Sequence, residues 1–210
     1  MKVPYADRNG VLVHASQVER GLACGCSCVE CGTRLVARRG PKTRPHFAHH
    51  AGSGDCDGES LLHRLGKRLL AQRIEVAIAT GRSVNVRWEC ERCYREHETD
   101  LVQGATGVGV EHTIRTADGG TIRPDVAVFG PSDEPQTLAE VVVTHEPDQA
   151  VNTYADVNGI AVAEFWIFTV ADLERLEHPR TLRPKKATLG CLTRIWRVFR
   201  VVPGQGGVWV

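Results

Sequence analysis

The chain has 210 residues and a formal net charge of +1, with 42% hydrophobic and 24% charged residues, which are the proportions of an ordinary soluble protein. This length allows one main domain with a proper core and a small appendage. No apolar run approaches the ~20 residues that cross a membrane, and the N-terminus lacks a charged start followed by an apolar stretch. We therefore expect no membrane anchor, no signal peptide and a cytoplasmic location.

The cysteines are grouped in a way that favours metal binding. Of the 8 cysteines, four form the pairs Cys28-x-x-Cys31 and Cys90-x-x-Cys93, and without an export signal such pairs predict thiolate ligands rather than disulfides. A short hairpin is expected after the first pair, followed by two histidines at finger-like distance. These residues predict a tetrahedral zinc site made by Cys28, Cys31, His46 and His49. Four nearby residues remain as alternative ligands: His50, Cys24, Cys26 and Cys56.

The charge is unevenly distributed along the chain. No acidic residue lies between Cys31 and Asp55, whereas this segment carries five basic ones: Arg34, Arg38, Arg39, Lys42 and Arg44. The C-terminal tail is also basic from Arg180 onward, with Trp196 and Phe199 between its arginines. Such segments suit contact with the phosphates and bases of a nucleic acid. A solvated face or an edge strand would show the same residue pattern.

A long amphipathic helix is predicted between Asp57 and Gly81. Asp57 can cap its start and Gly81 can end it, while leucines recur on one face at helical spacing. Glu59, His63 and Lys67 follow each other at intervals of four and form a polar stripe beside the leucines. Taken alone, this stripe could be a solvated face held by side-chain pairs.

The second cysteine pair follows a predicted strand from Ser83 to Cys90. The role of Cys90 and Cys93 stays open between a separate incomplete site near His97, a site completed from elsewhere, and no metal at all. One such completion joins the two pairs in a four-thiolate zinc ribbon. The glycine-rich segment 99–120 predicts a strand and a hairpin, and it contains no phosphate-binding fingerprint.

Two apolar runs on either side of a turn-rich loop each carry one carboxylate. They predict adjacent buried strands, with Asp125 in Ile-Arg-Pro-Asp-Val-Ala-Val and Glu140 in Leu-Ala-Glu-Val-Val-Val. Burying either charge is costly unless it is paired or binds a metal, so the two together suggest a shared cation such as Mg²⁺. A helix near Gln149–Asn158 is expected next. The strand Ala163–Val170 should then pair in parallel with the Glu140 strand.

At these residues the chain resembles a known group of enzymes. Arg123-Pro124-Asp125 and the following Glu140 resemble the core of the PD-(D/E)XK nuclease superfamily, except that the lysine expected two residues after the glutamate is Val142. The cysteine pair, His-Phe-Ala-His and Glu-Ser-x-x-His-x-x-x-Lys occur in the order of the competence protein CoiA-like family. The resemblance implies an α/β, restriction-endonuclease-like mixed sheet flanked by helices (57–210), with an N-terminal zinc-finger-like module (1–56).

The resemblance further implies a metal-dependent DNA nuclease acting in DNA uptake, recombination or phage defence. Asp125 and Glu140, together with Glu59, would hold Mg²⁺ or Mn²⁺, and Lys67 would supply the charge missing at Val142. His145, just past Glu140, is a second candidate to orient the water. The expected partners are DNA, including single-stranded DNA, and proteins of a DNA-processing complex. The alternatives are an inactive nuclease-fold DNA-binding module and a zinc-stabilised adaptor.

Overall fold

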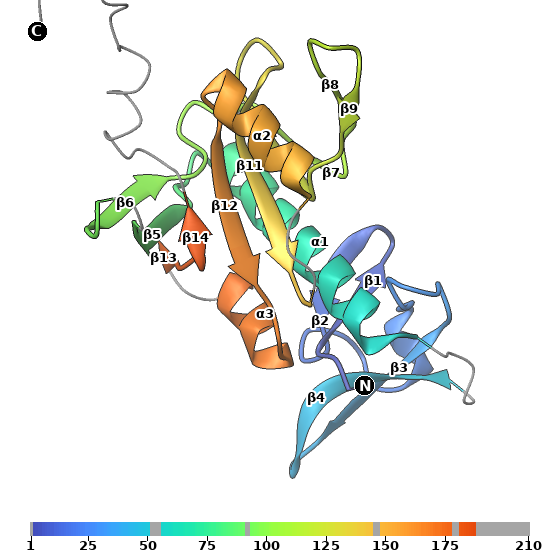
Figure 1. Cartoon of the computed structure of the whole chain (residues 1–210). Coiled ribbons are helices and arrows are strands. Elements are labelled where there is room, and N and C mark those ends of the chain that lie inside the picture. The colour runs from blue at the N-terminus through green and yellow to red at the C-terminus, as the bar shows by residue number, and fades with distance from the viewer. Residues whose placement is uncertain (1, 51–55, 91–92, 145–147, 178–180, 188–210) are drawn as a thin grey trace, which may run out of the picture.

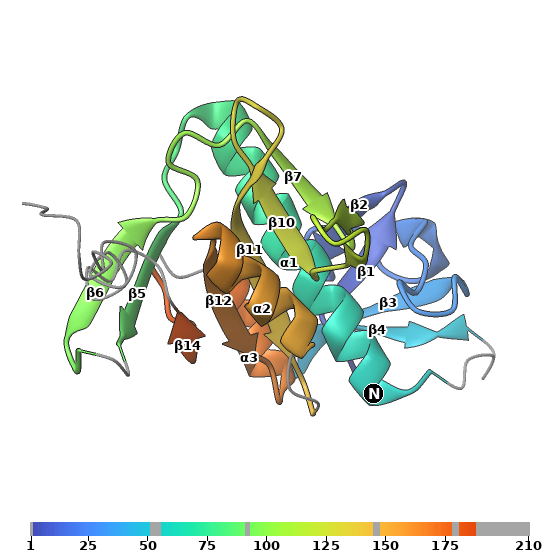
Figure 2. The same ribbon diagram turned by 45° about the horizontal axis from the view of Figure 1, so that its top comes forward.

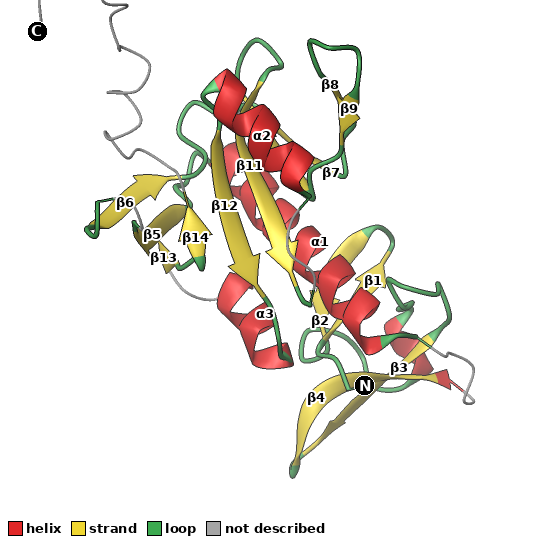
Figure 3. Cartoon of the chain, viewed as in Figure 1, coloured by secondary structure: helices red, strands yellow, loops and turns green. Residues whose placement is uncertain are grey.

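The computed structural model describes residues 2–50, 56–90, 93–144, 148–177 and 181–187, and it shows a mixed α/β fold (Figure 3). Its helices are α1 (Gly58–Thr80), α2 (Gln149–Asn158), α3 (Val170–Glu177) and the short 3-10 helix η1 (Leu22–Cys24). The strands before and just after α1 are β1 (Tyr5–Arg8), β2 (Val11–His14), β3 (Leu35–Gly40), β4 (Thr43–His49), β5 (Asn85–Glu89) and β6 (Glu96–Asp100). The remaining strands are β7 (Gly107–Val110), β8 (Ile114–Arg115), β9 (Thr121–Ile122), β10 (Val126–Phe129), β11 (Pro135–Val142), β12 (Ala161–Trp166), β13 (Thr181–Leu182) and β14 (Lys186–Ala187).

Helix α1 begins and ends where its sequence predicts. The Asp57 carboxylate accepts hydrogen bonds from the backbone N–H groups of Glu59 and Ser60, which satisfies two donors that a helix start leaves without partners. Gly81 ends the helix in the left-handed conformation, with φ of 63°, and only glycine adopts this conformation without steric cost. The prediction of a long capped helix is therefore confirmed.

The central sheet contains five strands in the order β14-β12-β11-β10-β7 (Figures 1 and 2). The two strands predicted to be adjacent are β10 and β11, which pair as an antiparallel hairpin, and β12 pairs in parallel with β11 after the chain passes through α2, as predicted. The helix predicted near Gln149–Asn158 is confirmed with those bounds. Because Val126 pairs with Ala139, the register places Asp125 and Glu140 side by side at the end of β10.

One prediction in this region is wrong. The strand expected over Ala163–Val170 is β12, which ends at Trp166, and Val170 opens α3 instead. The Asp172 carboxylate accepts hydrogen bonds from the backbone N–H groups of Phe168 and Thr169 and from the Thr169 hydroxyl. Asp172 thus reaches back from the first turn of α3 to the residues just before it, as in a capping box, and a residue run with good strand propensity gives way to a helix.

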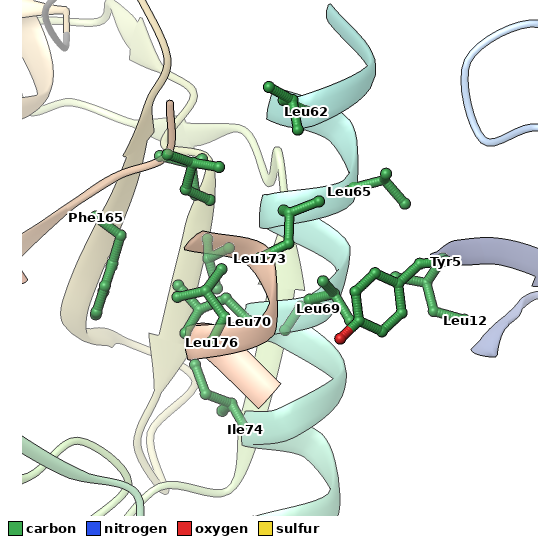
Figure 4. Packing of buried hydrophobic residues seen from close by; sticks show 14 of the residues in the cluster. Tyr5, Leu12, Leu62, Leu65, Leu69, Leu70, Ile74, Phe165, Leu173 and Leu176 are labelled. Atoms are coloured by element: carbon green, nitrogen blue, oxygen red, sulfur yellow. The ribbon is translucent and has the colours of Figure 1, made fainter. Parts of the chain in front are cut away.

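Helix α1 lies at the centre of the molecule. Figure 4 shows its leucines between Tyr5 and Leu12 of the N-terminal strands and Leu173 and Leu176 of α3, and all of these residues belong to one hydrophobic cluster. Helix α1 packs tightly on the sheet at Gly66, where an added Cβ would lie 2.8 Å from Val141 Cγ1 and 2.5 Å from Ile167 Cδ1. The next residue, Lys67, reaches Asp125 at the start of β10.

Two hairpins lie on opposite sides of this core. The predicted hairpin after the first cysteine pair is formed by β3 and β4, and the second cysteine pair lies at the end of the β5–β6 hairpin. Figures 1 and 2 show these hairpins at opposite ends of the molecule. In the part of the chain that the structure describes, no helix is both long enough and apolar enough to cross a membrane. The basic tail with Trp196 and Phe199 lies outside the described residues.

Candidate functional site

Asp125 and Glu140 come together at the end of strands β10 and β11. The backbone N–H of Asp125 donates a hydrogen bond of 3.2 Å to Glu140 Oε1, and the N–H of Val141 donates one of 2.8 Å to Asp125 Oδ2. Both carboxyl groups are largely buried: the Asp125 side chain is 13% exposed and Glu140 is 6% exposed. The two residues that the sequence predicted to share a cation are therefore neighbours.

Lys67 extends from α1 into the same place. Its ammonium lies 3.3 Å from Asp125 Oδ1 and 2.7 Å from Glu111 Oε1, and its side chain is only 7% exposed. Arg123 in turn pairs with Glu111 at 2.8 Å. Val142, at the position where the resemblance expects a lysine, is buried in the core. Lys67 thus supplies a positive charge beside Asp125 that the strand itself does not carry.

His63 is a site residue that the sequence placed only in a polar stripe. Its Nε2 lies 3.0 Å from Asp125 Oδ2, and with 36% of its side chain exposed it links the buried carboxylate to solvent. The stripe spacing of Glu59, His63 and Lys67 was the signal that could have found it, because residues four apart share a helix face. No sequence pattern indicates Glu111, because only the folded chain brings it next to Lys67.

The two carboxyl groups differ in their protonation. Burial raises the pKa of Asp125, but the hydrogen bonds from His63 and from the Val141 N–H outweigh this effect, and the pKa lies below its usual value. Burial, followed by the charge of Asp125, raises the pKa of Glu140 to about 8. At neutral pH without a metal, Asp125 is therefore ionised and Glu140 retains its proton.

A cavity of about 380 Å³ opens next to this pair. It lies between the first turns of α1 and the end of β11, and its lining residues are Asp57, Glu59, Ser60, His63, Val141, Val143 and Thr144. Glu59 therefore faces the cavity that His63 shares. In the described residues, however, no three potential ligand atoms that include Asp125 or Glu140 lie within 4.8 Å of one another. His145, the other predicted participant, lies outside the described residues.

A second candidate site is a cluster of thiols and one imidazole near the start of α1. Cys28, Cys31, His49 and Cys56 each direct one ligand atom to a common point, with all four atoms within 4.8 Å of one another. The separations are 3.6 Å for Cys28 Sγ to Cys56 Sγ, 3.4 Å for Cys31 Sγ to His49 Nε2 and 3.5 Å for Cys56 Sγ to His49 Nε2. Zinc–ligand bonds of ~2.0–2.3 Å give tetrahedron edges of about 3.5–3.8 Å. The cluster is therefore compatible with a structural zinc site.

The cluster differs in one member from the predicted ligand set, because Cys56, one of the alternative ligands, lies where His46 was expected. Both histidines lie on β4, and residues three apart on a strand point to opposite faces. His46 is buried on the other face, with its Nδ1 2.9 Å from the carbonyl oxygen of Arg44. Cys56 instead joins the cluster from its position immediately before Asp57, the residue that caps the start of α1.

Cys90, Cys93 and His97 form a separate group whose ligand atoms also lie within 4.8 Å of one another. None of the ligand atoms of the first cluster belongs to it, so among the described residues the two cysteine pairs do not combine into a four-thiolate ribbon.

Comparisons with protein-family models, with characterised proteins and with solved structures give no significant match for this chain.

Proposed function

We propose that the chain is a nuclease that hydrolyses DNA with the help of Mg²⁺ or Mn²⁺. The observation that carries this proposal is the position of the Lys67 ammonium, 3.3 Å from Asp125 and beside the buried Glu140. Two hard oxygen ligands and one positive charge at the ends of two central strands are groups that metal-dependent phosphodiester hydrolysis can use. The proposal also rests on the resemblance to PD-(D/E)XK nucleases, with the lysine provided by α1.

The donor set fits a hard divalent cation. Oxygen ligands are what Mg²⁺ and Mn²⁺ prefer, and a carboxyl group whose pKa is raised by burial and by a neighbouring negative charge gains a partner when a cation replaces its proton. Asp125 and Glu140 would hold the ion, with Glu59 at the rim of the adjoining cavity. When bound, the ion would activate water and stabilise charge on the cleaved phosphate.

The remaining residues have roles that follow from their contacts. His63 and the Val141 N–H hold the Asp125 carboxylate in one orientation. Lys67 is fixed between Asp125 and Glu111, where its ammonium can orient water and offset the charge of a phosphate. His63 also lines the cavity, where its imidazole would face a phosphate bound there.

The test is cleavage of supercoiled plasmid and of single-stranded DNA, with and without added Mg²⁺ or Mn²⁺. We expect metal-dependent cleavage by the wild type and a loss of at least about a hundredfold in Asp125→Asn and Lys67→Met, because each removes charge stabilisation at the reacting phosphate. Asp118→Asn, an exposed carboxylate in the β8–β9 turn, serves as the control and should cleave like the wild type.

The variants should also separate metal binding from catalysis. Mg²⁺ should raise the melting temperature of the wild type and of Lys67→Met but not that of Asp125→Asn. DNA binding without cleavage would instead identify an inactive binding module. In such a module the Lys67 ammonium, and not a metal ion, offsets the charge of Asp125 and Glu140. Absence of both binding and cleavage would favour the adaptor.

A further inference from the structure

The backbone around the second cysteine pair repeats that around the first. In the first pair, the N–H of Cys28 donates to the Thr33 carbonyl at 2.8 Å, and the N–H of Gly32 donates to the Cys28 carbonyl at 2.9 Å. In the second pair, the N–H of Cys90 donates to the Arg95 carbonyl at 2.9 Å, and the N–H of Tyr94 donates to the Cys90 carbonyl at 2.8 Å. The two turns therefore share the same hydrogen bonds at the same spacing.

The residue after the second cysteine of each turn has the same unusual conformation. Gly32 has φ of 69° and Tyr94 has φ of 55°. Glycine enters the left-handed region freely, but tyrosine does so only at a cost, which the surrounding structure must offset. The Tyr94 side chain is 81% exposed, so packing does not explain the conformation. The conformation is instead the one that this turn needs in order to direct both thiols to the same side.

An imidazole completes the group in the second turn. His97 lies on β6 and its ring stacks on the buried Trp88 of β5, with ring centroids 5.3 Å apart. The His97 Nε2 lies 2.9 Å from Cys93 Sγ, closer than the roughly 3.5 Å edge of a zinc tetrahedron, so the two atoms would separate slightly around an ion. Cys90, Cys93 and His97 thus offer two thiolates and one imidazole, which are ligands that zinc prefers.

We infer that the β5–β6 hairpin carries a second zinc site, formed by Cys90, Cys93 and His97. The described residues provide three ligands, so a zinc ion here has a fourth coordination position for water or another ligand from outside this set. The ion would lie at the turn of a hairpin whose one other strand partner among the described residues is the two-residue β13. Small hairpins are marginally stable alone, and a metal at the turn holds the adjoining ends of the two strands together. This inference does not depend on the proposed nuclease activity.

The test is the zinc content of the purified full chain, measured by elemental analysis together with protein concentration. The expected value is two zinc ions per chain in the wild type, one each in Cys93→Ser and His97→Gln, and one in Cys31→Ser through loss of the other site. Glu98→Gln, an exposed position on the same strand β6, is the matched control and should keep both ions.

A rescue variant distinguishes a ligand from a residue that merely supports the fold. His97→Cys should keep two metal ions, and after replacement of zinc by Co²⁺ its thiolate-to-cobalt absorption should exceed that of the wild type, since one more sulfur is bound. One zinc per chain in the wild type, or wild-type zinc content in both Cys93→Ser and His97→Gln, would overturn the inference. So would a His97→Cys chain with the zinc content of His97→Gln.

Discussion

Lys67 shows how a single residue can be explained by its partners. A lysine side chain that is only 7% exposed is costly to bury unless its charge is paired, and its ammonium contacts carboxylates from two different segments, Asp125 and Glu111. The Lys67 hydrogen bond is also the main cause of the lowered pKa of Glu111. The three residues therefore form one electrostatic unit, and removing the ammonium would leave the buried Asp125 carboxylate near the exposed Glu111 carboxylate without the cation between them.

At the same scale, Cys56 and His46 test the ligand set of the first cluster. We expect Cys56→Ser to lose one zinc ion per chain that His46→Gln keeps, because the Cys56 sulfur lies 3.6 Å from Cys28 Sγ whereas His46 faces the other side of β4. Elemental analysis of both variants, each compared with the wild type, provides the measurement. A His46→Gln chain that loses the ion while Cys56→Ser retains it would restore the ligand set predicted from the sequence.

Glu140 should make the metal-free protein less stable as the pH rises. Its pKa is about 8 in the folded chain against an ordinary value of 4.5, so between these values the folded state holds a proton that the unfolded state has lost. The free energy of unfolding therefore falls with increasing pH across this window, by at most about 1.4 kcal/mol per pH unit, and levels off above it.

This dependence can be measured by urea unfolding from pH 5 to pH 9 without added Mg²⁺ or Mn²⁺. Glu140→Gln should flatten the curve and be the more stable chain near pH 8, because the amide never ionises. Added Mg²⁺ should flatten the wild-type curve in the same way if the ion binds the carboxylate. An unchanged pH slope in Glu140→Gln would show that another group causes it.

Among the elements, α1 determines the geometry of the acid site. It carries His63 and Lys67 and packs against β11 at Gly66, while its other faces contact the N-terminal strands and α3. The position of both functional side chains therefore depends on how closely one turn of this helix approaches the sheet. This dependence makes Gly66 the residue at which element packing can be tested.

We expect Gly66→Ala to destabilise the protein even though alanine is the better helix former. The new methyl group would meet Val141 Cγ1 at 2.8 Å, next to Glu140, and overpacking of this kind costs about 1–3 kcal/mol, against a gain in helix propensity of about 1 kcal/mol or less. Glu75→Ala on the exposed face of α1 is the control and should change stability by less than about 0.5 kcal/mol. Urea unfolding of the wild type and the two variants provides the comparison. Equal stability of Gly66→Ala and the wild type would mean that α1 can move away from the sheet without cost.

For the whole molecule, local signals predicted the elements better than the contacts between them. The caps Asp57 and Gly81, the β10–β11 hairpin and α2 are all encoded within short segments, and the structure confirms them. By contrast, the Lys67–Glu111 pair and the contact of Cys56 with the other members of the thiol cluster bring together residues that are far apart in the sequence or lie on separate elements. Periodicity carries no information on such contacts, so the sequence indicated the residue types of each site but not its full membership.

His46 and α3 illustrate two further limits of the sequence. The histidines follow the first cysteine pair at finger-like distance, but a finger presents its histidines from a helix, whereas β4 turns residues three apart to opposite faces. The run Ile167-Phe168-Thr169-Val170 has strand propensity, but the Asp172 side chain starts a helix there. Strand geometry decided the first case, and one side chain outside the apolar run decided the second.

The position of Cys56 has a consequence for the order in which the segments of a newly synthesised chain can fold. Synthesis proceeds from the N-terminus at ~5–20 residues per second, so Cys28, Cys31, His49 and Cys56 all leave the ribosome before the partners that complete the acid site at Asp125 and Glu140. The thiol cluster can then close while most of the sheet is still unmade. Its last member adjoins the cap of α1, so the nascent helix starts from a fixed point before the strands that it will cover exist.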